Sequence, residues 1–183
     1  DQRPRPARPQ LRPAYQGANP ISDLWSLEAL RLVAEFLPRA VADTSDDEAR
    51  AQMIMASTLA GIGFGNAGVH LPHGMSYPVA GMVKAFKPAG YAVDYPLVPH
   101  GMAVIVNAPA VFRFTASACP ERHLHAAGVL GADIAGVGLE AAGEVLAARI
   151  IEFMRQLDMP NGLAALGYER DHIPALVQGT LPQ

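Results

Sequence analysis

Apolar residues recur at helical spacing near the start of the chain, between residues 22 and 37. The apolar positions are Leu24, Leu27, Leu30, Val33 and Leu37. Residues three and four apart lie on one face of a helix, so this stretch predicts an amphipathic helix. We expect Ser22 to be its N-cap, and Asp23 stands in the first turn, where a negative charge favours the helix dipole.

The next stretch, residues 49–65, is rich in alanine and methionine and carries no charge after Arg50. Ser45 and Glu48 precede it with the spacing of a capping box, which marks the start of a helix. A helix with so few polar positions has no obvious solvent face. We therefore expect it to be buried on most sides.

The middle of the chain is less regular. Residues 84–98 show no periodicity and contain Pro88 and Gly90, which interrupt regular structure. Residues 99–116 are strongly apolar and leave two alternatives, a strand because of their β-branched content or a buried helix. We favour the helix, because Pro99 suits the start of a helix and the run is long.

Three further helices are expected in the last third. Residues 121–131 predict a short helix closed by Gly131, and residues 171–178 a final helix followed by Gly179. Residues 138–158 form the clearest amphipathic pattern. Its apolar stripe consists of Leu139, Ala142, Leu146, Ile150, Phe153 and Leu157. No alternation typical of strands is visible, so the fold class is all-α, with about six to eight helices.

Composition sets the boundaries of this helical unit. A chain of 183 residues with 50% hydrophobic residues can bury one sizeable core. Residues 1–19 interleave arginine with proline, which predicts a leader loop or linker, with an arm for an anionic partner as the alternative. We therefore divide the chain into this leader and an all-helical domain over residues 20–183.

Charge and cysteine content narrow the partners and the location. A net charge of −3 argues against a nucleic-acid surface, which is usually basic. No uninterrupted run approaches the roughly 18 apolar residues of a membrane span, so we expect no membrane contact. The single cysteine, Cys119, excludes an internal disulfide and is typical of a reducing compartment. We expect the cytoplasm, or the mitochondrial matrix in a eukaryotic cell.

Histidines flanked by glycine and proline are the main candidates for chemistry. His73 and Tyr77 are four residues apart and share a helix face, with His70 close by. The Pro-His-Gly sequence recurs at residues 99–101, where His100 would stand at the positive end of a helix and stay neutral. Two histidines from separate helices make half a metal site. The alternative is two histidines that serve packing only.

Other chemical signatures are weak. Asp94 is the nearest carboxylate to either histidine, and it lies in the irregular segment. The glycines at 61–68 follow no strand and precede no lysine, so they do not form a phosphate-binding loop. His123 and His125 are two residues apart and face different ways on a helix, so we expect them, like Cys119, to serve packing.

Residues 61–81 (GIGFGNAGVHLPHGMSYPVAG) and 91–116 (YAVDYPLVPHGMAVIVNAPAVFRFTA) resemble the iron-containing (group III) alcohol dehydrogenases, specifically their carboxy-terminal helical domain. Residues 12–41 and 163–183 also match, and the chain is most similar to the hydroxyacid-oxoacid transhydrogenase branch. The resemblance implies the all-helical part of that family's dehydroquinate synthase-like fold. Its α/β domain, which binds NAD, would precede this sequence.

The resemblance also assigns the site residues. The family holds a divalent metal, usually iron, with one aspartate and three histidines; His73 and His100 match the last two ligands, and the first two would precede this sequence. Phe64 matches a position that lines the substrate pocket. Tyr77 replaces a second, non-ligand histidine near the nicotinamide, and with His70 it is a catalytic candidate. Two imidazoles suit Fe²⁺ or Zn²⁺, so the residues leave both open.

The resemblance implies a metal-dependent oxidoreductase that transfers hydride between a hydroxy acid, such as 4-hydroxybutyrate, and an oxo acid, such as 2-oxoglutarate, through bound NAD. One alternative is an NAD-dependent dehydrogenase of simple alcohols and aldehydes; another is a non-catalytic helical module. The expected partners are the small-molecule substrate and further copies of the chain in a homo-oligomer. With two of four ligands and no cofactor domain, this chain alone is expected to be inactive.

Overall fold

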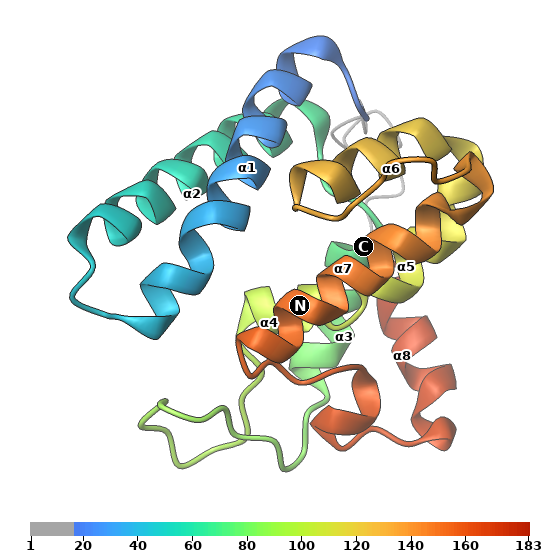
Figure 1. Ribbon diagram of the computed structural model, residues 1–183. Helices are drawn as coiled ribbons and strands as arrows, with labels where there is room; N and C mark the ends of the chain where they lie inside the picture. Colours follow the sequence, from blue (N-terminus) through green and yellow to red (C-terminus); the bar gives the residue numbers. More distant parts are fainter. Residues whose placement is uncertain (1–16) are drawn as a thin grey trace.

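The computed structural model describes residues 17–183 and contains eight α-helices in that range (Figure 1). They are α1 (Pro20–Ala42), α2 (Asp47–Ala67), α3 (Leu71–Gly81), α4 (His100–Ile105), α5 (Ala108–Thr115), α6 (Pro120–Val129), α7 (Ala142–Gln156) and α8 (Ile173–Thr180). Single 3₁₀ turns are η2 (Ala116–Ala118), η3 (Leu139–Ala141), η4 (Leu163–Leu166) and η5 (Arg170–His172). No strand occurs among these described residues, which confirms the all-α prediction. Residues 1–16 of the predicted leader lie outside the described range.

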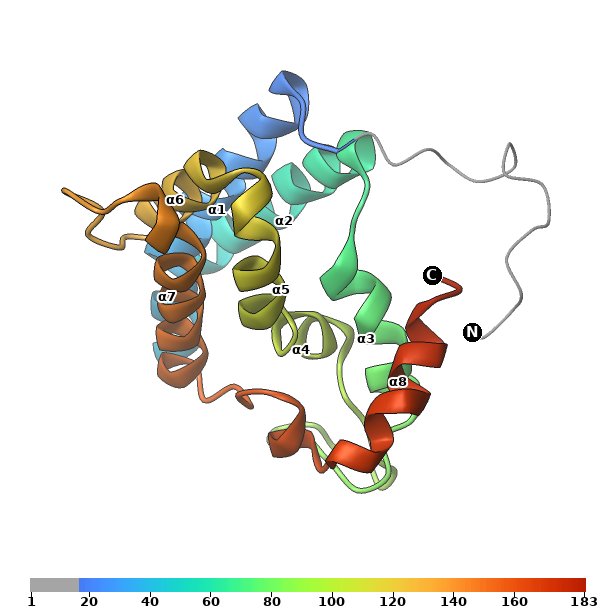
Figure 2. The same cartoon turned by 90° about the vertical axis from the view of Figure 1, so that its right-hand side faces the viewer.

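The helices form three groups: α1 with α2, α5 and α6 with α7, and α3 with α4 and α8. Helices α1 and α2 pack side by side as a hairpin, and α1 also contacts α6. Helix α7 packs against α5 and α6, while α3 lies between α4 and α8 (Figure 2). The segment between α3 and α4 has no helix, as its lack of periodicity predicts. This arrangement brings the start of α3 and the start of α4 together.

The buried apolar residues form two separate clusters. The larger one joins α3, α4, α6, α7 and α8 and includes Val79, Ala103, Ala127, Leu146, Ile150, Met154 and Leu176. The smaller one lies between α1 and α2 and consists of Ala29, Leu32, Phe36, Ala49, Ala56 and Leu59. The α1–α2 hairpin therefore has its own small core, whereas α3 and α4, which carry His73 and His100, contribute to the larger cluster.

The N-caps of the first two helices differ from the predicted ones. Helix α1 is capped by Asn19, whose side-chain oxygen accepts a hydrogen bond from the Ser22 backbone N–H at 3.0 Å. Ser22 cannot be the cap because Pro20 already occupies the first turn. Helix α2 is capped by Asp46, which accepts from the Ala49 N–H at 2.9 Å. The predicted capping box at Ser45 is wrong, because the Ser45 hydroxyl donates to Asp43 instead.

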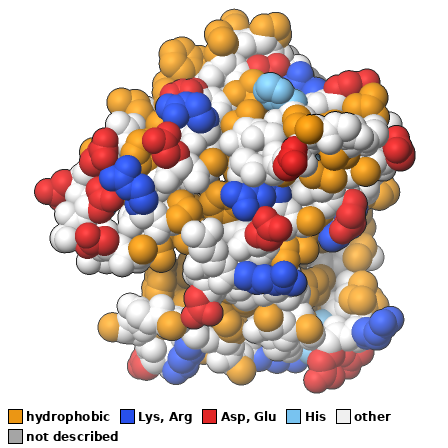
Figure 3. Space-filling view, viewed as in Figure 1, with side chains coloured by type: hydrophobic (Ala, Val, Ile, Leu, Met, Phe, Trp, Pro, Cys, Tyr) orange, Lys and Arg blue, Asp and Glu red, His pale blue; other side chains and the backbone are white. Residues whose placement is uncertain are grey.

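Helix α2 is not buried on most sides, and that prediction is also wrong. Its large apolar side chains Ile54, Met55, Ile62 and Phe64 are 71%, 51%, 40% and 52% exposed. The physical reason is that α2 packs mainly against α1, so its other faces meet no helix within the described residues. Apolar side chains also reach the surface over the first turns of α1, where Ile21 and Leu24 are exposed (Figure 3).

Residues 99–116 are helical, but in two pieces, α4 and α5. The break lies at Asn107 because Pro109 has no N–H to donate to an earlier carbonyl. The buried Asn107 side chain donates to the Ala103 carbonyl at 2.8 Å and closes α4. By length and composition alone, residues 100–118 could cross a membrane, with a mean hydropathy of 1.2. In this fold α4 packs on α3 and α5 packs on α7.

The carboxy-terminal helices follow their predicted patterns with two differences. Leu139, the first residue of the predicted stripe, lies in η3 before α7 and is 43% exposed. Gly131 closes α6 with a φ of 86°, and the stripe of α7 from Ala142 to Phe153 is buried. Gly179, expected after the last helix, lies inside α8. A Cβ at Gly179 would come within 2.7 Å of the Pro78 Cβ, so the glycine allows α8 to approach α3 closely.

The Tyr168 hydroxyl fixes the end of α3. It donates a 2.7 Å hydrogen bond to the carbonyl of Val79, and both residues are buried. Tyr168→Phe leaves that carbonyl without its partner, and we expect it to lower the free energy of unfolding by about 1–2 kcal/mol in urea denaturation. Tyr95→Phe, at an exposed tyrosine, is the matched control and should change stability by less than about 0.5 kcal/mol. Equal effects of the two substitutions would contradict this role.

Candidate metal and substrate site

His73 and His100 come together from two helices. His73 is the third residue of α3 and His100 is the first residue of α4. Each helix begins next to a proline, Pro72 in the first turn of α3 and Pro99 as the residue before α4. The two imidazole ring centroids are 5.4 Å apart and the rings are inclined at 58°. Two imidazole rings that are 27 residues apart in sequence thus lie side by side.

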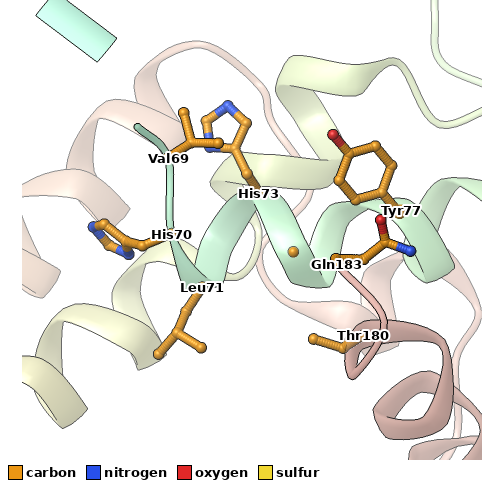
Figure 4. Close-up of a pocket in the computed structure, with 8 residues that line it drawn as sticks. Val69, His70, Leu71, His73, Tyr77, Thr180 and Gln183 are labelled. Atoms are coloured by element: carbon orange, nitrogen blue, oxygen red, sulfur yellow. The ribbon is translucent and has the colours of Figure 1, made fainter. Parts of the chain in front are cut away.

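A cavity of about 380 Å³ lies beside His73 at the start of α3 (Figure 4). Its lining residues are Val69, His70, Leu71, His73, Gly74, Tyr77, Thr180 and Gln183. Tyr77 lies on the same helix as His73, and its ring centroid is 6.3 Å from that of His100. Thr180 is the last residue of α8 and Gln183 follows that helix, which Gly179 allows to lie close to Pro78 of α3. The cavity therefore combines aromatic, hydroxyl and amide groups with the imidazoles.

The surroundings of His73 favour its neutral form. Burial of the ring lowers its pKa, and the nearby His100 and His70, when protonated, lower it further. A neutral imidazole keeps the lone pair that a metal ion needs. Next to it, the buried Ser76 hydroxyl donates to the His73 carbonyl at 2.7 Å, which ties the residue to the first turn of α3.

The spacing of the two imidazole rings is the spacing expected of two ligands of one metal ion. Rings bound to one tetrahedral ion with metal–nitrogen bonds of about 2.1 Å have centroids roughly 5 Å apart, close to the observed 5.4 Å. Protein metal sites usually have three or four protein ligands. Between residues 17 and 183, no group of three or more His, Cys, Asp or Glu side chains could hold a metal ion. Asp94 is exposed and does not line the cavity.

His70 and Phe64 lie differently from His73. The His70 side chain extends away from His73 and Tyr77 (Figure 4), and it lines both this cavity and a larger one of about 730 Å³ between α1, α5, α6 and α7. Phe64 is half-exposed on α2 and is not among the residues that line either cavity. Their functional assignments stay predictions.

The sequence did not predict two residues that line the cavity, Thr180 and Gln183. They reach the cavity only because α8 packs against α3, and no local sequence pattern predicts that packing. His123 is buried, as its predicted packing role requires, with Nε2 3.0 Å from the Thr115 hydroxyl oxygen and Nδ1 3.0 Å from the Cys119 carbonyl oxygen. Phe112, which contacts His123, is an apolar residue in an apolar run and gave no signal.

The sequence was compared with known protein families and with known proteins, and both comparisons found matches. Residues 14–183 match the Fe-containing alcohol dehydrogenase family, C-terminal part. A mouse (Mus musculus) protein named "Hydroxyacid-oxoacid transhydrogenase, mitochondrial" is 58% identical over 180 residues, which cover 98% of this chain and 39% of that protein. The chain thus spans about two fifths of the length of this relative.

Two solved structures share the fold. A 1,3-propanediol oxidoreductase superposes with a TM-score of 0.80 at 32% identity, covering 92% of this chain and 41% of that one. A sulfoacetaldehyde reductase from Bifidobacterium kashiwanohense in complex with NAD⁺ superposes with a TM-score of 0.70 at 26% identity, covering 91% of this chain and 39% of that one.

Proposed function

This chain belongs to the Fe-containing alcohol dehydrogenase family, and from that premise we propose that it is the helical, metal-binding part of a hydroxyacid-oxoacid transhydrogenase. The full protein would transfer hydride between a hydroxy acid, such as 4-hydroxybutyrate, and an oxo acid, such as 2-oxoglutarate, through bound NAD. The 58% identity to the mouse transhydrogenase over nearly the whole chain supports this choice within the family.

The proximity of the His73 and His100 rings, 5.4 Å apart beside a cavity, is the observation that carries the proposal. These two residues would hold a divalent metal, with Fe²⁺ favoured by the family and Zn²⁺ as the alternative. The remaining ligands would come from outside the described residues, because those residues supply no third donor. A divalent metal held there would supply Lewis-acid chemistry toward a carbonyl or alkoxide oxygen.

The chain's own groups shape the substrate side of the site. Tyr77 lines the cavity, and its hydroxyl can donate a hydrogen bond to an oxygen of the substrate. Gly74 lines the same cavity, and because it has no side chain a substrate can approach its backbone. Thr180 already donates its hydroxyl proton to the Leu176 carbonyl, so its oxygen can only accept here. We propose Tyr77 as the catalytic hydrogen-bond donor and His70, which lines the cavity, as part of the pocket wall. For Phe64, which lines neither cavity, a place in the pocket of the full protein is supported by the family resemblance alone.

The same proposal includes a bound NAD cofactor, a cellular compartment and an oligomeric state for the full protein. NAD would be held mainly by a domain outside this chain, in keeping with the NAD⁺ complex of the related sulfoacetaldehyde reductase. The mouse relative's name places that protein in mitochondria; for this chain we propose the cytoplasm, or the mitochondrial matrix in a eukaryotic cell. Assembly into a homo-oligomer stays part of the proposal.

A second candidate function is an NAD-dependent dehydrogenase of simple alcohols and aldehydes. The structural similarity to 1,3-propanediol oxidoreductase favours it. The two candidates share the metal and differ in how the cofactor turns over: a transhydrogenase keeps NAD bound through both half-reactions, whereas a dehydrogenase exchanges it.

The transhydrogenase reaction gives the sharpest test of the proposal. The full-length protein, freed of loose NAD by gel filtration, should convert 4-hydroxybutyrate and 2-oxoglutarate into the succinic semialdehyde and 2-hydroxyglutarate pair over many turnovers. Product pairs are measured by mass spectrometry. Added NAD should change this rate by less than about 2-fold, because a bound cofactor is oxidised and reduced in place.

The opposite outcomes separate the alternatives. Turnover that depends on free NAD and proceeds with 1,3-propanediol but without an oxo acid would establish the simple dehydrogenase. Absence of turnover with either substrate set, in metal-loaded protein, would favour a non-catalytic helical module.

A further inference from the structure

The helix pair that carries the two histidines is joined at a second point, away from them. His70, at the start of α3, places its ring edge against Phe112 of α5, with centroids 6.4 Å apart and an interplanar angle of 79°. Helix α5 follows α4 almost directly. The segment that begins with His100 therefore meets the start of α3 at His70, in addition to the ring pairs that His100 forms with His73 and Tyr77.

The His70–Phe112 contact constrains the end of α3 that carries His73. The other neighbours of α3 are α4 and α8, and without the contact at His70 the first turn of α3 could shift and change the angle between the His73 and His100 rings. The His70–Phe112 contact removes this freedom at the first turn of α3, where the His70 carbonyl accepts hydrogen bonds from the backbone N–H groups of His73 and Gly74 at 2.9 and 3.1 Å. A shift of residue 70 is thereby transmitted to His73.

A third ring, that of His123 on α6, also packs against Phe112. The two rings meet edge to face, with ring centroids 5.8 Å apart and an interplanar angle of 78°. His123 is only 8% exposed and is held at both nitrogens, by the Thr115 hydroxyl and the Cys119 carbonyl. Edge-to-face geometry is an arrangement that aromatic rings favour.

We infer that the stack His123–Phe112–His70 is a positioning device that sets the geometry of the His73–His100 pair for metal binding. Phe112 and His123 are positioning residues and touch neither substrate nor metal. His70 acts in the same way, as a support for the first turn of α3. This inference rests on the proposed function, since it assumes that the pair binds a metal.

Phe112→Leu tests the inference, because it removes the ring and keeps most of the apolar volume. In the full-length protein we expect the dissociation constant for Zn²⁺, measured by competition with a chromogenic chelator, to rise by about 10-fold, the lower end of the range for residues that orient metal ligands. The absorption spectrum of the Co²⁺-loaded protein should shift as well, because it reports ligand geometry. Phe112→Tyr keeps the ring and should restore both readouts.

Phe114→Leu is the matched control. Phe114 lies on the same helix but is 77% exposed, so its loss should leave Zn²⁺ affinity and the Co²⁺ spectrum unchanged. Wild-type affinity and spectrum in Phe112→Leu would overturn the inference, as would equal changes in the two leucine variants. If Phe112→Leu does not fold, His123→Leu decides: a rise of about 3-fold or more in the dissociation constant supports the device, and no change overturns it.

A parallel His73→Ala variant separates this inference from the proposed function. If His73→Ala loses the metal and Phe112→Leu binds it normally, the positioning role fails and the function stands. If His73→Ala binds Zn²⁺ as the wild type does, the proposed function itself fails.

Discussion

His73→Ala, in the full-length protein, is expected to lose most of its bound metal and to lower kcat/KM by about 10³-fold or more. The substitution removes one of two imidazoles that lie 5.4 Å apart. A bound metal supplies several kcal/mol of transition-state stabilisation, and about 4 kcal/mol corresponds to a 10³-fold rate. Metal content is measured by elemental analysis after dialysis, and His100→Ala should behave in the same way.

His125→Ala is the control for these variants. His125 is exposed on α6 and lines only the larger cavity, so its removal should leave metal content unchanged. Full metal content in both His73→Ala and His100→Ala would contradict metal binding by the pair and would favour a helical module whose histidines serve packing.

Gly143→Val is expected to lower the free energy of unfolding by about 3 kcal/mol, at the upper end of overpacking effects. A Cβ at this position of α7 would lie 2.7 Å from the Ala116 Cβ and 3.2 Å from both the Arg113 Cα and the Phe112 carbonyl oxygen. Two of these atoms belong to the backbone, so the contact is relieved only if α5 moves away from α7. The measurement is urea denaturation followed by circular dichroism.

Gly61→Ala also adds a side chain to a helical glycine, but we expect it to stabilise the protein. Gly61 lies in α2, and a methyl group added there would meet no atom of another residue's side chain or of a neighbouring helix within 4 Å. The alanine should therefore raise stability by about 0.5–1 kcal/mol through helix propensity. If Gly143→Val were as well tolerated as Gly61→Ala, the close approach of α5 and α7 would be wrong.

The helices with one clear apolar face could be predicted from sequence. Helix α7 shows why: its stripe is long, regular and bordered by charges, and the structure buries it from Ala142 to Phe153. Helix α2 shows the limit. Its composition indicates apolarity on all sides, but burial depends on which neighbours are present, and here α2 meets mainly α1. Helix starts were misplaced by one to three residues, because Asn19 and Asp46 compete with equally suitable neighbours.

The sequence predicted which residues belong to the site, but it could not predict how they are arranged in space. The repeated Pro-His-Gly sequence and the family resemblance pointed to His73 and His100. Their convergence depends on the path of residues 82–99, which has no periodicity to interpret. The stack of His70, Phe112 and His123 joins three separate segments of the chain, and no local pattern could reveal it.

Anomalous X-ray diffraction from crystals of the metal-loaded, full-length protein tests the central claim most directly. Data collected at the absorption edge of the bound metal should give one strong peak, bonded to a ring nitrogen of His73 and to a ring nitrogen of His100. A peak that contacts neither residue, or only one of them, would contradict the account.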